Sequence, residues 1–339
     1  MNGENAIEAE GVALTYSDGT EAVRGVDLTV PRGEFFGFLG PNGAGKTTTI
    51  KILATLLKPT GGRVTVNGFD VEREARNVRG SIGYMPQETS IDPELTAREN
   101  LAFACESYGV PRGERGERID ELLDLVDLAD VADKRADDFS GGMRKRLDAA
   151  TSLVHRPPLV FLDEPTTGLD PKARNRLWEY FRRINDQGTT IFLTTQYLEE
   201  ADQLCDRIGV INSGEIVAEG SPTELKRRVG GEILDIELAD GQEANERAAR
   251  VAHESAIFES GVSIEVTDDG ISVTSERARS HGTDLLVALR DAGLTVTGFN
   301  VRAPTLDDVF LAITGEHVDE SVEDDGAETE PTEPTEVAQ

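Results

Sequence analysis

The first part of the chain alternates apolar and polar positions and then changes to an apolar run that leads into a glycine loop. Residues 6–39 are typical of short β segments, separated by turn signals at residues 17–20 and 31–33. The apolar run Phe35–Leu39 is followed by Gly40–Gly45 and then by residues 46–57, which have helix-forming composition. The pattern therefore predicts a strand, a loop and a helix in that order.

The middle of the chain continues this alternation. Residues 159–162 and 190–193 are predicted to be buried strands, and residues 171–186 between them a polar helix. Alternating strands and helices favour a largely parallel sheet covered by helices. Residues 88–155 interrupt the pattern, and we interpret them as an inserted helical subdomain. Its predicted helices include residues 95–108 and 115–128.

The last third of the chain predicts a second, smaller unit. Composition shifts near residues 226–231, which we interpret as a linker. The segments beyond it read strand, helix, strand, strand, helix, strand: residues 233–238, 243–254, 262–266, 271–274, 283–292 and 294–301. This βαββαβ order is that of a ferredoxin-like unit, and a short helix over residues 306–313 is predicted to close it. We expect domains over residues 1–228 and 229–315, followed by an acidic tail over residues 316–339.

Charge restricts the possible partners. The 339 residues include 64 acidic and 34 basic side chains, a formal charge of −30. This charge repels nucleic-acid phosphates and disfavours a protein that binds DNA or RNA through a broad basic face. Residues 316–339 hold ten carboxylates and no Lys or Arg, so we expect the tail to be disordered. The rest of the chain is acidic too, which indicates a salt-rich cytoplasm; an ordinary acidic protein is the alternative.

Other features of the sequence bear on location. No apolar run approaches the roughly 18 residues of a membrane helix. The acidic start of the chain lacks the basic and apolar regions of a secretory signal. Only Cys105 and Cys205 could form a disulfide, and nothing in the sequence indicates that they do. We therefore expect a cytoplasmic protein in a reducing compartment.

The glycine loop fits a phosphate-binding motif, G-x-x-x-x-G-K-[ST], in the required place between a strand and a helix. Glycines let backbone N–H groups and the positive end of the helix approach a polyphosphate. Lys46 is expected to hold the β and γ phosphates, and Thr47 to offer its hydroxyl to Mg²⁺. A glycine turn that merely caps a helix is the weaker alternative. The predicted nucleotide contacts are Gly40, Pro41, Asn42, Gly43, Ala44, Gly45, Lys46, Thr47 and Thr48.

Two carboxylates end the apolar strand over residues 159–162. Asp163 is placed to hold Mg²⁺, and Glu164 to polarise the water that attacks the γ phosphate. A solvated turn after a core strand would explain such a pair if it stood alone. The phosphate loop elsewhere in the chain favours the catalytic interpretation.

A second anion site is predicted between these two motifs. Ser140 is a good helix N-cap, and Gly141 and Gly142 leave the first amides of that helix uncovered. One nucleotide does not need two such sites. A capped helix after a loop is the simple alternative, and only the combination with the other motifs makes this one informative.

Taken in this order, residues 6 to about 225 resemble the ATP-binding subunits of ABC transporters. Tyr16 matches the aromatic residue that stacks on adenine, and Gln87 matches the glutamine that contacts Mg²⁺ and the attacking water. Residues 140–143 match the family signature, and Asp170 matches the loop that communicates across a dimer. The resemblance implies an α/β P-loop NTPase (RecA-like) core with an antiparallel β subdomain and a helical insert.

One residue departs from that family. After the strand over residues 190–193 the family usually has a His that touches the γ phosphate, and this chain has Gln196. Glutamine can donate an amide hydrogen bond but cannot become cationic. Gln196, the segment 141–146 and the segment 304–310 are most similar to the daunorubicin-resistance type of exporter ATPase, which also carries a small C-terminal domain.

The resemblance implies roles for individual side chains. Catalysis is expected to depend on Lys46, Gln87, Glu164 and Gln196. The expected Mg²⁺ ligands are Thr47, Gln87 and Asp163. Tyr16, Ser140, Gly141, Gly142 and Asp170 are expected to complete the ATP site.

The resemblance further implies the ATP-binding and hydrolysing subunit of an ABC-2 type exporter. Two copies would bind two Mg-ATP head to tail, and hydrolysis would power a separate transmembrane permease at the inner face of the membrane. A soluble ABC ATPase is one alternative, weakened by the single nucleotide site and the acidic surface. A switch in which ATP only drives dimerisation is another, favoured by Gln196 and disfavoured by Glu164.

Overall fold

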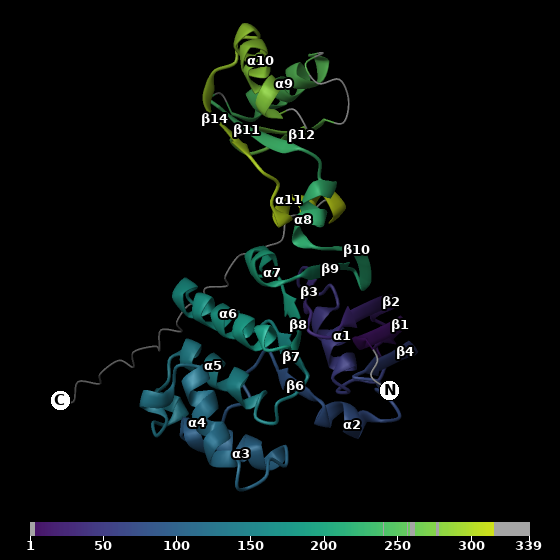
Figure 1. Ribbon diagram of the computed structural model, residues 1–339. Coiled ribbons are helices and arrows are strands. Elements are labelled where there is room, and N and C mark those ends of the chain that lie inside the picture. Colours follow the sequence, from purple (N-terminus) through teal and green to yellow (C-terminus); the bar gives the residue numbers. More distant parts are fainter. Residues whose placement is uncertain (1–3, 240, 256, 258–261, 276–277, 315–339) are drawn as a thin grey trace, which may run out of the picture.

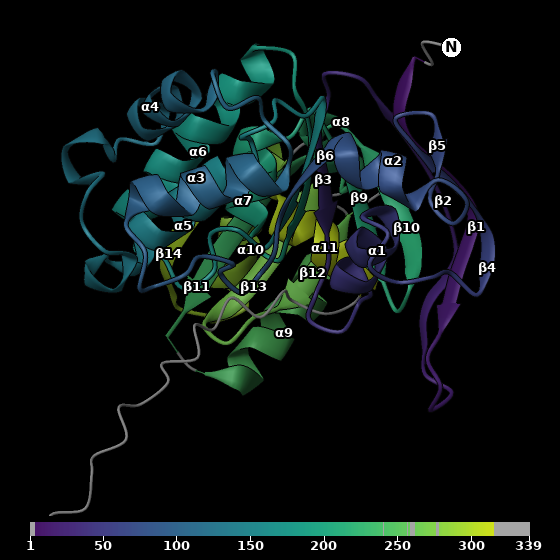
Figure 2. The same ribbon diagram turned by 90° about the horizontal axis from the view of Figure 1, so that it is seen from below.

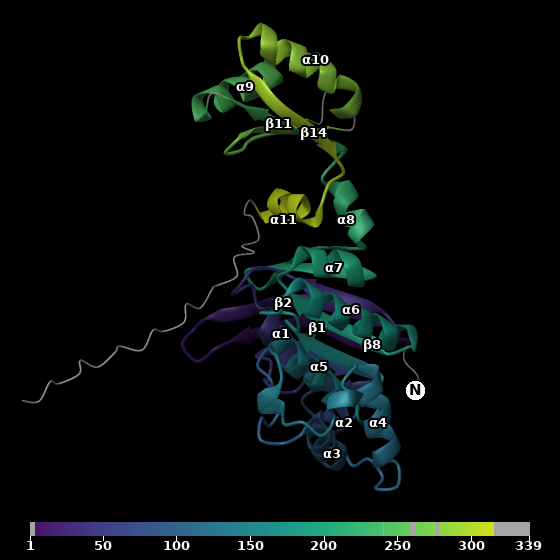
Figure 3. The same cartoon turned by 90° about the vertical axis from the view of Figure 1, so that its left-hand side faces the viewer.

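The computed structural model describes residues 4–314, apart from residues 240, 256, 258–261 and 276–277. Figures 1 and 3 show two packed units, a large core below and a smaller C-terminal unit above. Two short helices, α8 (Pro222–Arg228) and α11 (Leu306–Thr314), lie between them. The predictions made for residues 316–339 concern a part of the chain outside the described residues.

A six-stranded sheet forms the middle of the core, in the order β10-β9-β3-β8-β7-β6. Its strands are β3 (Phe35–Leu39), β6 (Ile82–Met85), β7 (Leu159–Asp163), β8 (Thr190–Thr195), β9 (Arg207–Asn212) and β10 (Glu215–Gly220). All neighbouring strands are parallel except β10, which pairs antiparallel with β9. The predicted parallel sheet is confirmed, although β6, β9 and β10 were not predicted.

Both faces of this sheet are buried. Successive side chains of a strand point to opposite sides, so each strand contributes residues to both faces. Phe35 and Leu39 of β3 pack into a cluster with the helices on one side, and Phe36 and Phe38 pack into a second cluster on the other. The helices on the first side are α3 (Ala97–Ser107), α4 (Arg115–Leu125), α5 (Gly141–Thr151), α6 (Pro171–Asp186) and α7 (Leu198–Leu204). Figure 2 shows them opposite the antiparallel strands.

The second side carries an antiparallel sheet in the order β2-β1-β4-β5, together with two helices. These elements are β1 (Asn5–Thr15), β2 (Glu21–Pro31), β4 (Gly61–Val66), β5 (Phe69–Asp70), α1 (Lys46–Leu53) and α2 (Ala75–Gly80). The alternating apolar residues of β1 and β2 face α1 and the central sheet. Their burial places α1, and the loop before it, against the end of β3.

Two helices end three or four residues earlier than predicted. α1 ends at Leu53 rather than at residue 57, and α4 ends at Leu125 rather than at residue 128. Two residues further on, Thr55 and Asp127 adopt left-handed backbone conformations, with φ of 63° and 57°. A left-handed residue cannot continue a right-handed helix, and apolar periodicity gives no signal for it.

The C-terminal unit has the predicted βαββαβ order. Its elements are β11 (Glu232–Leu238), α9 (Gln242–Glu254), β12 (Ser263–Val266), β13 (Gly270–Ser275), α10 (Ala278–Asp291) and β14 (Val296–Arg302). The strands lie in the order β12-β13-β11-β14, and every neighbouring pair is antiparallel. Leu234, Ile236 and Leu285 bury one face of this sheet against α9 and α10. The predicted ferredoxin-like arrangement is confirmed.

The helix after β14 does not close the C-terminal unit, contrary to the prediction. α11 instead packs on α8 and α7, and its Leu306, Val309 and Phe310 join the hydrophobic cluster of the core. The predicted linker is also partly helical, since α8 continues to Arg228. At the end of β14, Arg302 binds Asp308 of α11 at 2.6 Å and so holds the returning helix. α11 packs against the core because its apolar face must be buried.

Phe310→Ala is expected to lower the free energy of unfolding by roughly 3 kcal/mol or more, because it opens a cavity where α11 meets the core. The Phe310 side chain is 1% exposed, whereas Phe299 on β14 is 62% exposed. Phe299→Ala is therefore the matched control and should stay within about 0.5 kcal/mol of wild type. Denaturant unfolding at high salt measures both, and equal losses would contradict the packing of α11.

Candidate functional site

The loop between β3 and α1 needs glycine at two positions. Gly45 has φ of 104°, and a Cβ atom there would lie 2.4 Å from the carbonyl oxygen of Ala22. A Cβ atom on Gly40 would lie 2.3 Å from the carbonyl oxygen of Ile211. Any larger residue at either position would push the loop away from β2, which contains Ala22, or from β9, which contains Ile211. α1 begins at Lys46 directly after the loop, so N–H groups without partners in the helix are available beside it.

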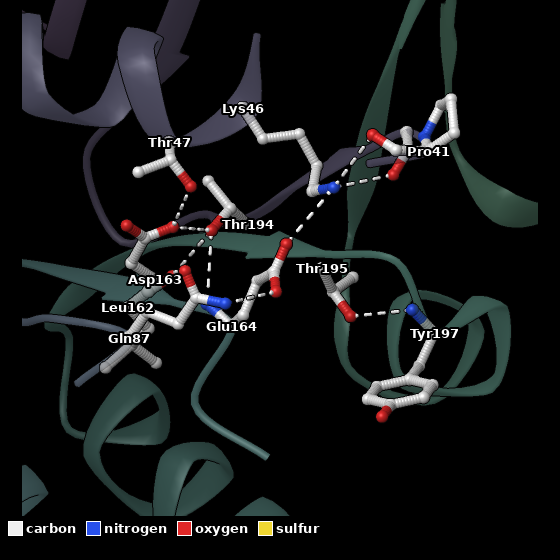
Figure 4. A network of polar contacts seen from close by, with 11 residues as sticks. Pro41, Lys46, Thr47, Gln87, Leu162, Asp163, Glu164, Thr194, Thr195 and Tyr197 are labelled. Atoms are coloured by element: carbon white, nitrogen blue, oxygen red, sulfur yellow. Dashed lines mark hydrogen bonds and ion pairs between the residues drawn. The ribbon is translucent and has the colours of Figure 1, made fainter. Parts of the chain in front are cut away.

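Lys46 lies at the centre of the site with its ammonium surrounded by oxygen atoms. Its side chain is 4% exposed, and Nζ donates to the carbonyl oxygens of Gly40 at 2.8 Å and Pro41 at 3.1 Å. Nζ also lies 3.1 Å from Oε1 of Glu164. Figure 4 shows the side chain reaching between the loop and the end of β7. The structure thus brings the predicted phosphate lysine and the predicted catalytic carboxylate into direct contact.

The two carboxylate oxygens of Asp163 differ in their contacts with the described residues. Oδ1 accepts hydrogen bonds from Thr47 Oγ1 at 3.2 Å and from Thr194 Oγ1 at 2.6 Å. Oδ2 is buried and has no hydrogen-bond partner within the described residues. Burial raises the pKa of Asp163 and the Glu164 charge raises it further, while the Thr194 hydrogen bond opposes both. A buried carboxylate oxygen beside a threonine hydroxyl fits a hard divalent cation such as Mg²⁺.

Glu164 is held in an uncommon backbone conformation. Its φ is 47°, and its N–H donates to the carbonyl oxygen of Thr194 at 3.0 Å. Residues of this kind cluster at functional sites, because surrounding contacts must stabilise them. The conformation directs the side chain of Glu164 toward Lys46 and Gln87 (Figure 4), and Gln87 Nε2 donates to Oε2 at 3.2 Å. Two of the predicted catalytic residues therefore contact the same carboxylate.

Tyr16 lies beside the loop with its ring open to solvent. Its side chain is 40% exposed, and its hydroxyl lies 3.1 Å from Oγ1 of Thr48 on α1. This hydrogen bond joins the end of β1 to the start of α1. An exposed aromatic ring at the rim of a phosphate loop is available for stacking on a flat base.

Ser140 and Asp170 form a second group, separate from the Lys46 cluster. Ser140 Oγ accepts from the N–H of Met143 at 3.3 Å and caps α5, and Asp170 accepts from the N–H of Ala173 at 2.9 Å and caps α6. A Cβ atom on Gly142 would lie 2.9 Å from Cβ of Ala173, so the two helices start side by side. Ser140, Gly141 and Asp170 are exposed. Within the described residues, none of them joins the hydrogen bonds around Lys46.

Gln196 follows the last residue of β8 and is half-buried. The turn after it is held by Thr195 Oγ1, which accepts from the N–H of Tyr197 at 2.9 Å. Gln196 thus leaves the sheet at the same edge as Asp163 and Glu164, since β7 and β8 are parallel neighbours.

Thr194 has no role that was predicted from the sequence, although it contacts both carboxylate residues. Its hydroxyl donates to Asp163, its carbonyl oxygen accepts from Glu164, and its side chain is fully buried. The pairing of Asp163 with Thr194 across β7 and β8 creates these contacts. A threonine at the polar end of an apolar strand is too common to reveal such a role.

Comparison with known proteins decides the family. Residues 23–167 match the family model described as ABC transporter, and residues 220–314 match the C-terminal domain of DrrA1-3-like ATP-binding proteins. The chain is 45% identical to the daunorubicin/doxorubicin resistance ATP-binding protein DrrA of Streptomyces peucetius, over 96% of this chain and 97% of the relative. The chain belongs to the DrrA-type ATP-binding proteins of ABC transporters.

Two further matches extend this result. The chain is 36% identical to the linearmycin resistance ATP-binding protein LnrL of Bacillus subtilis (strain 168), over 91% of this chain and 98% of that one. A solved dimeric ATP-binding cassette in a post-hydrolysis state, bound to ADP and Pi, covers 63% of this chain and 98% of its own, with 29% identity and a TM-score of 0.59. As a DrrA-type protein, the chain binds and hydrolyses ATP, and the predicted P-loop NTPase fold is confirmed.

Proposed function

We propose that this chain is the ATP-hydrolysing subunit of an ABC-2 type exporter, in which two copies bind two Mg-ATP and act on a separate transmembrane permease. The observation that carries the proposal is the buried contact between Lys46 and Glu164, beside an Asp163 oxygen that has no hydrogen-bond partner among the described residues. The relatives named for drug resistance support export. No helix of the described residues is long and apolar enough to span a bilayer, so transport would depend on the permease.

The contacts of Lys46 support a role in binding and in timing hydrolysis. The Lys46 ammonium is paired with the carboxylate of Glu164. Phosphate oxygens at the loop would compete for the same ammonium and release Glu164 from the ion pair. The freed carboxylate would then accept a proton from the attacking water, with Gln87 positioned at its other oxygen.

Asp163, Thr47 and Gln87 would hold Mg²⁺. When bound, this ion neutralises charge on the phosphate oxygens. Asp163 Oδ2 is the residue atom best suited to it, because it is buried without a hydrogen-bond partner in the part of the chain that the structure describes. Gln196 would supply a neutral donor near the γ phosphate in place of an imidazole.

The exposed helix ends at Ser140 and Asp170 support a homodimer. They offer uncovered amides and a capped helix start, yet lie outside the Lys46 cluster of their own chain. A second copy placed head to tail would bring Ser140, Gly141 and Gly142 to its neighbour's nucleotide. The solved cassette that this chain resembles is dimeric, which supports association of two copies. With a charge of −30, nucleic acid is not proposed as a partner. The dimer would lie at the cytoplasmic face of the membrane.

Mixing two inactive variants tests the shared site. Lys46→Ala and Ser140→Arg should each be inactive alone, but a mixed dimer contains one site with both residues intact. Half of the dimers are mixed and have one working site, so ATP hydrolysis should recover to about a quarter of the wild-type rate. A mixture of Lys46→Ala and Glu164→Gln is the matched control, because both defects lie in the same half of the site and no intact site forms.

Absence of recovery in the first mixture at every salt concentration would overturn the head-to-tail dimer.

Co-purification tests the exporter role. A six-helix membrane protein should accompany the tagged chain from detergent-solubilised membranes. Ribosomes in its place would favour the soluble ABC ATPase, and ATP-driven dimerisation without phosphate release would favour the switch.

A further inference from the structure

The helix that Ser140 caps also holds the segment that follows Gln87. Asp148 of α5 is 1% exposed, and its carboxylate accepts from Ser90: from the hydroxyl at 2.5 Å and from the N–H at 3.3 and 3.4 Å. One turn earlier on α5, Lys145 Nζ donates to the backbone carbonyl oxygen of Gln87. Residues three apart on a helix share a face, so both ends of residues 87–90 are fixed to one side of α5.

The burial of Asp148 needs an explanation. Residues 87–90 lie at the surface, whereas the carboxylate that binds them is buried. Burial raises the pKa of Asp148, and the hydrogen bonds from Ser90 oppose this. An apolar side chain could fill the same space without desolvating a charge. The carboxylate does what an apolar side chain cannot, since it accepts both donors of Ser90 at once.

The contacts continue from this segment to the catalytic carboxylate. Gln87 is joined to α5 through its backbone, and its side-chain amide donates to Glu164 at 3.2 Å (Figure 4). A displacement of α5 would therefore displace the amide of Gln87 relative to Glu164. The same displacement would move Ser140, because it caps this helix.

We propose that Asp148 is a positioning residue for ATP hydrolysis, which makes α5 and residues 87–90 move as one body. The inference rests on the proposed dimer. When Ser140 engages the nucleotide held by the partner copy, α5 takes a defined position, and Asp148 and Lys145 transmit that position to Gln87 at Glu164 of their own chain. Each chain thereby senses the neighbouring site through its own signature helix.

Asp148→Asn tests the proposal with little change of volume. The amide keeps one oxygen acceptor and replaces the other with an N–H group, so it cannot accept the Ser90 donors on two oxygens as the carboxylate does. We expect kcat to fall about tenfold, with KM for ATP within about twofold of wild type, as for other residues that orient a catalytic group. Ser90→Ala should give the same fall, the double variant no further fall, and Ser90→Thr should retain activity because it keeps the hydroxyl.

Asp124→Asn is the matched control, because Asp124 is an exposed carboxylate on α4 of the same helical region. It should leave kcat unchanged. A folded Asp148→Asn protein with wild-type kcat, or Ser90 and Asp148 losses that simply add, would overturn the positioning role. A merely structural role would lower the unfolding midpoint without separating kcat from KM. A wild-type kcat for Asp148→Asn together with recovered hydrolysis in the Lys46→Ala and Ser140→Arg mixture would overturn the positioning role but not the dimer. Absence of that recovery would overturn the proposed dimer itself.

Discussion

Glu164→Gln is expected to stop ATP hydrolysis while ATP binding is retained. Glutamine has nearly the same shape and can keep a contact with Gln87, but it cannot accept a proton from water. Loss of a general base lowers a rate by roughly 10²- to 10⁴-fold. Binding should be as tight as in wild type or tighter, since Lys46 no longer gives up an ion pair when it takes a phosphate. Phosphate release and equilibrium ATP titration at high salt measure the two effects.

Glu199→Gln is the control for loss of a negative charge. Glu199 lies on α7, is 67% exposed and, among the described residues, forms a long ion pair with Arg174 at 3.8 Å. Its substitution should change neither hydrolysis nor binding. A Glu164→Gln protein that hydrolyses ATP at the wild-type rate would show that another group is the base. One that no longer binds ATP would show that Glu164 is needed to form the site.

Lys46→Ala is expected to weaken ATP binding by a factor of roughly 30 or more. Removal of one partner from a buried, hydrogen-bonded charge pair costs about 2–5 kcal/mol in binding. The substitution should also lower the free energy of unfolding by roughly 3–5 kcal/mol, because it leaves Glu164 buried at 6% exposure without its cation. ATP titration and denaturant unfolding measure these losses separately. Lys58→Ala is the control, since Lys58 is 80% exposed.

The double variant Lys46→Ala/Glu164→Gln separates the two roles of the lysine. Removal of the Glu164 charge should restore most of the stability lost in Lys46→Ala, because no unpaired charge remains buried. ATP binding should stay lost, since the phosphates still lack their cation. Recovery of binding in the double variant would mean that Lys46 acts only as the counter-ion of Glu164.

The parts of the site that follow one another in the chain could be predicted. Gly40–Gly45 and Lys46 are adjacent in sequence. A glycine loop between an apolar strand and a helix lets backbone N–H groups approach a phosphate, so this part of the site is recognisable from the sequence. The ends of β7 and β8 were likewise recognisable from apolar runs followed by polar residues. Local periodicity also predicted the βαββαβ order of the C-terminal unit.

The contacts between distant segments could not be predicted. Thr194 meets Asp163 only because β7 and β8 pair in one particular register. The ion pair of Lys46 with Glu164 depends on the left-handed backbone at Glu164. The position of α11 was predicted wrongly, because an amphipathic pattern shows that a helix buries one face but does not show what covers it.

By itself, the sequence predicted the candidate residues for the chemistry, the βαββαβ order of the C-terminal unit and the family of the protein. These features depend on residues that are near one another along the chain. Backbone conformational preferences and the spacing of apolar side chains are both set within a few residues. Only the tertiary structure decided that one Asp163 oxygen lacks a hydrogen-bond partner within the described part of the chain, that Asp148 holds Ser90, and that α11 returns to the core. Such contacts depend on strand register and on packing, which are settled only when the whole chain has folded.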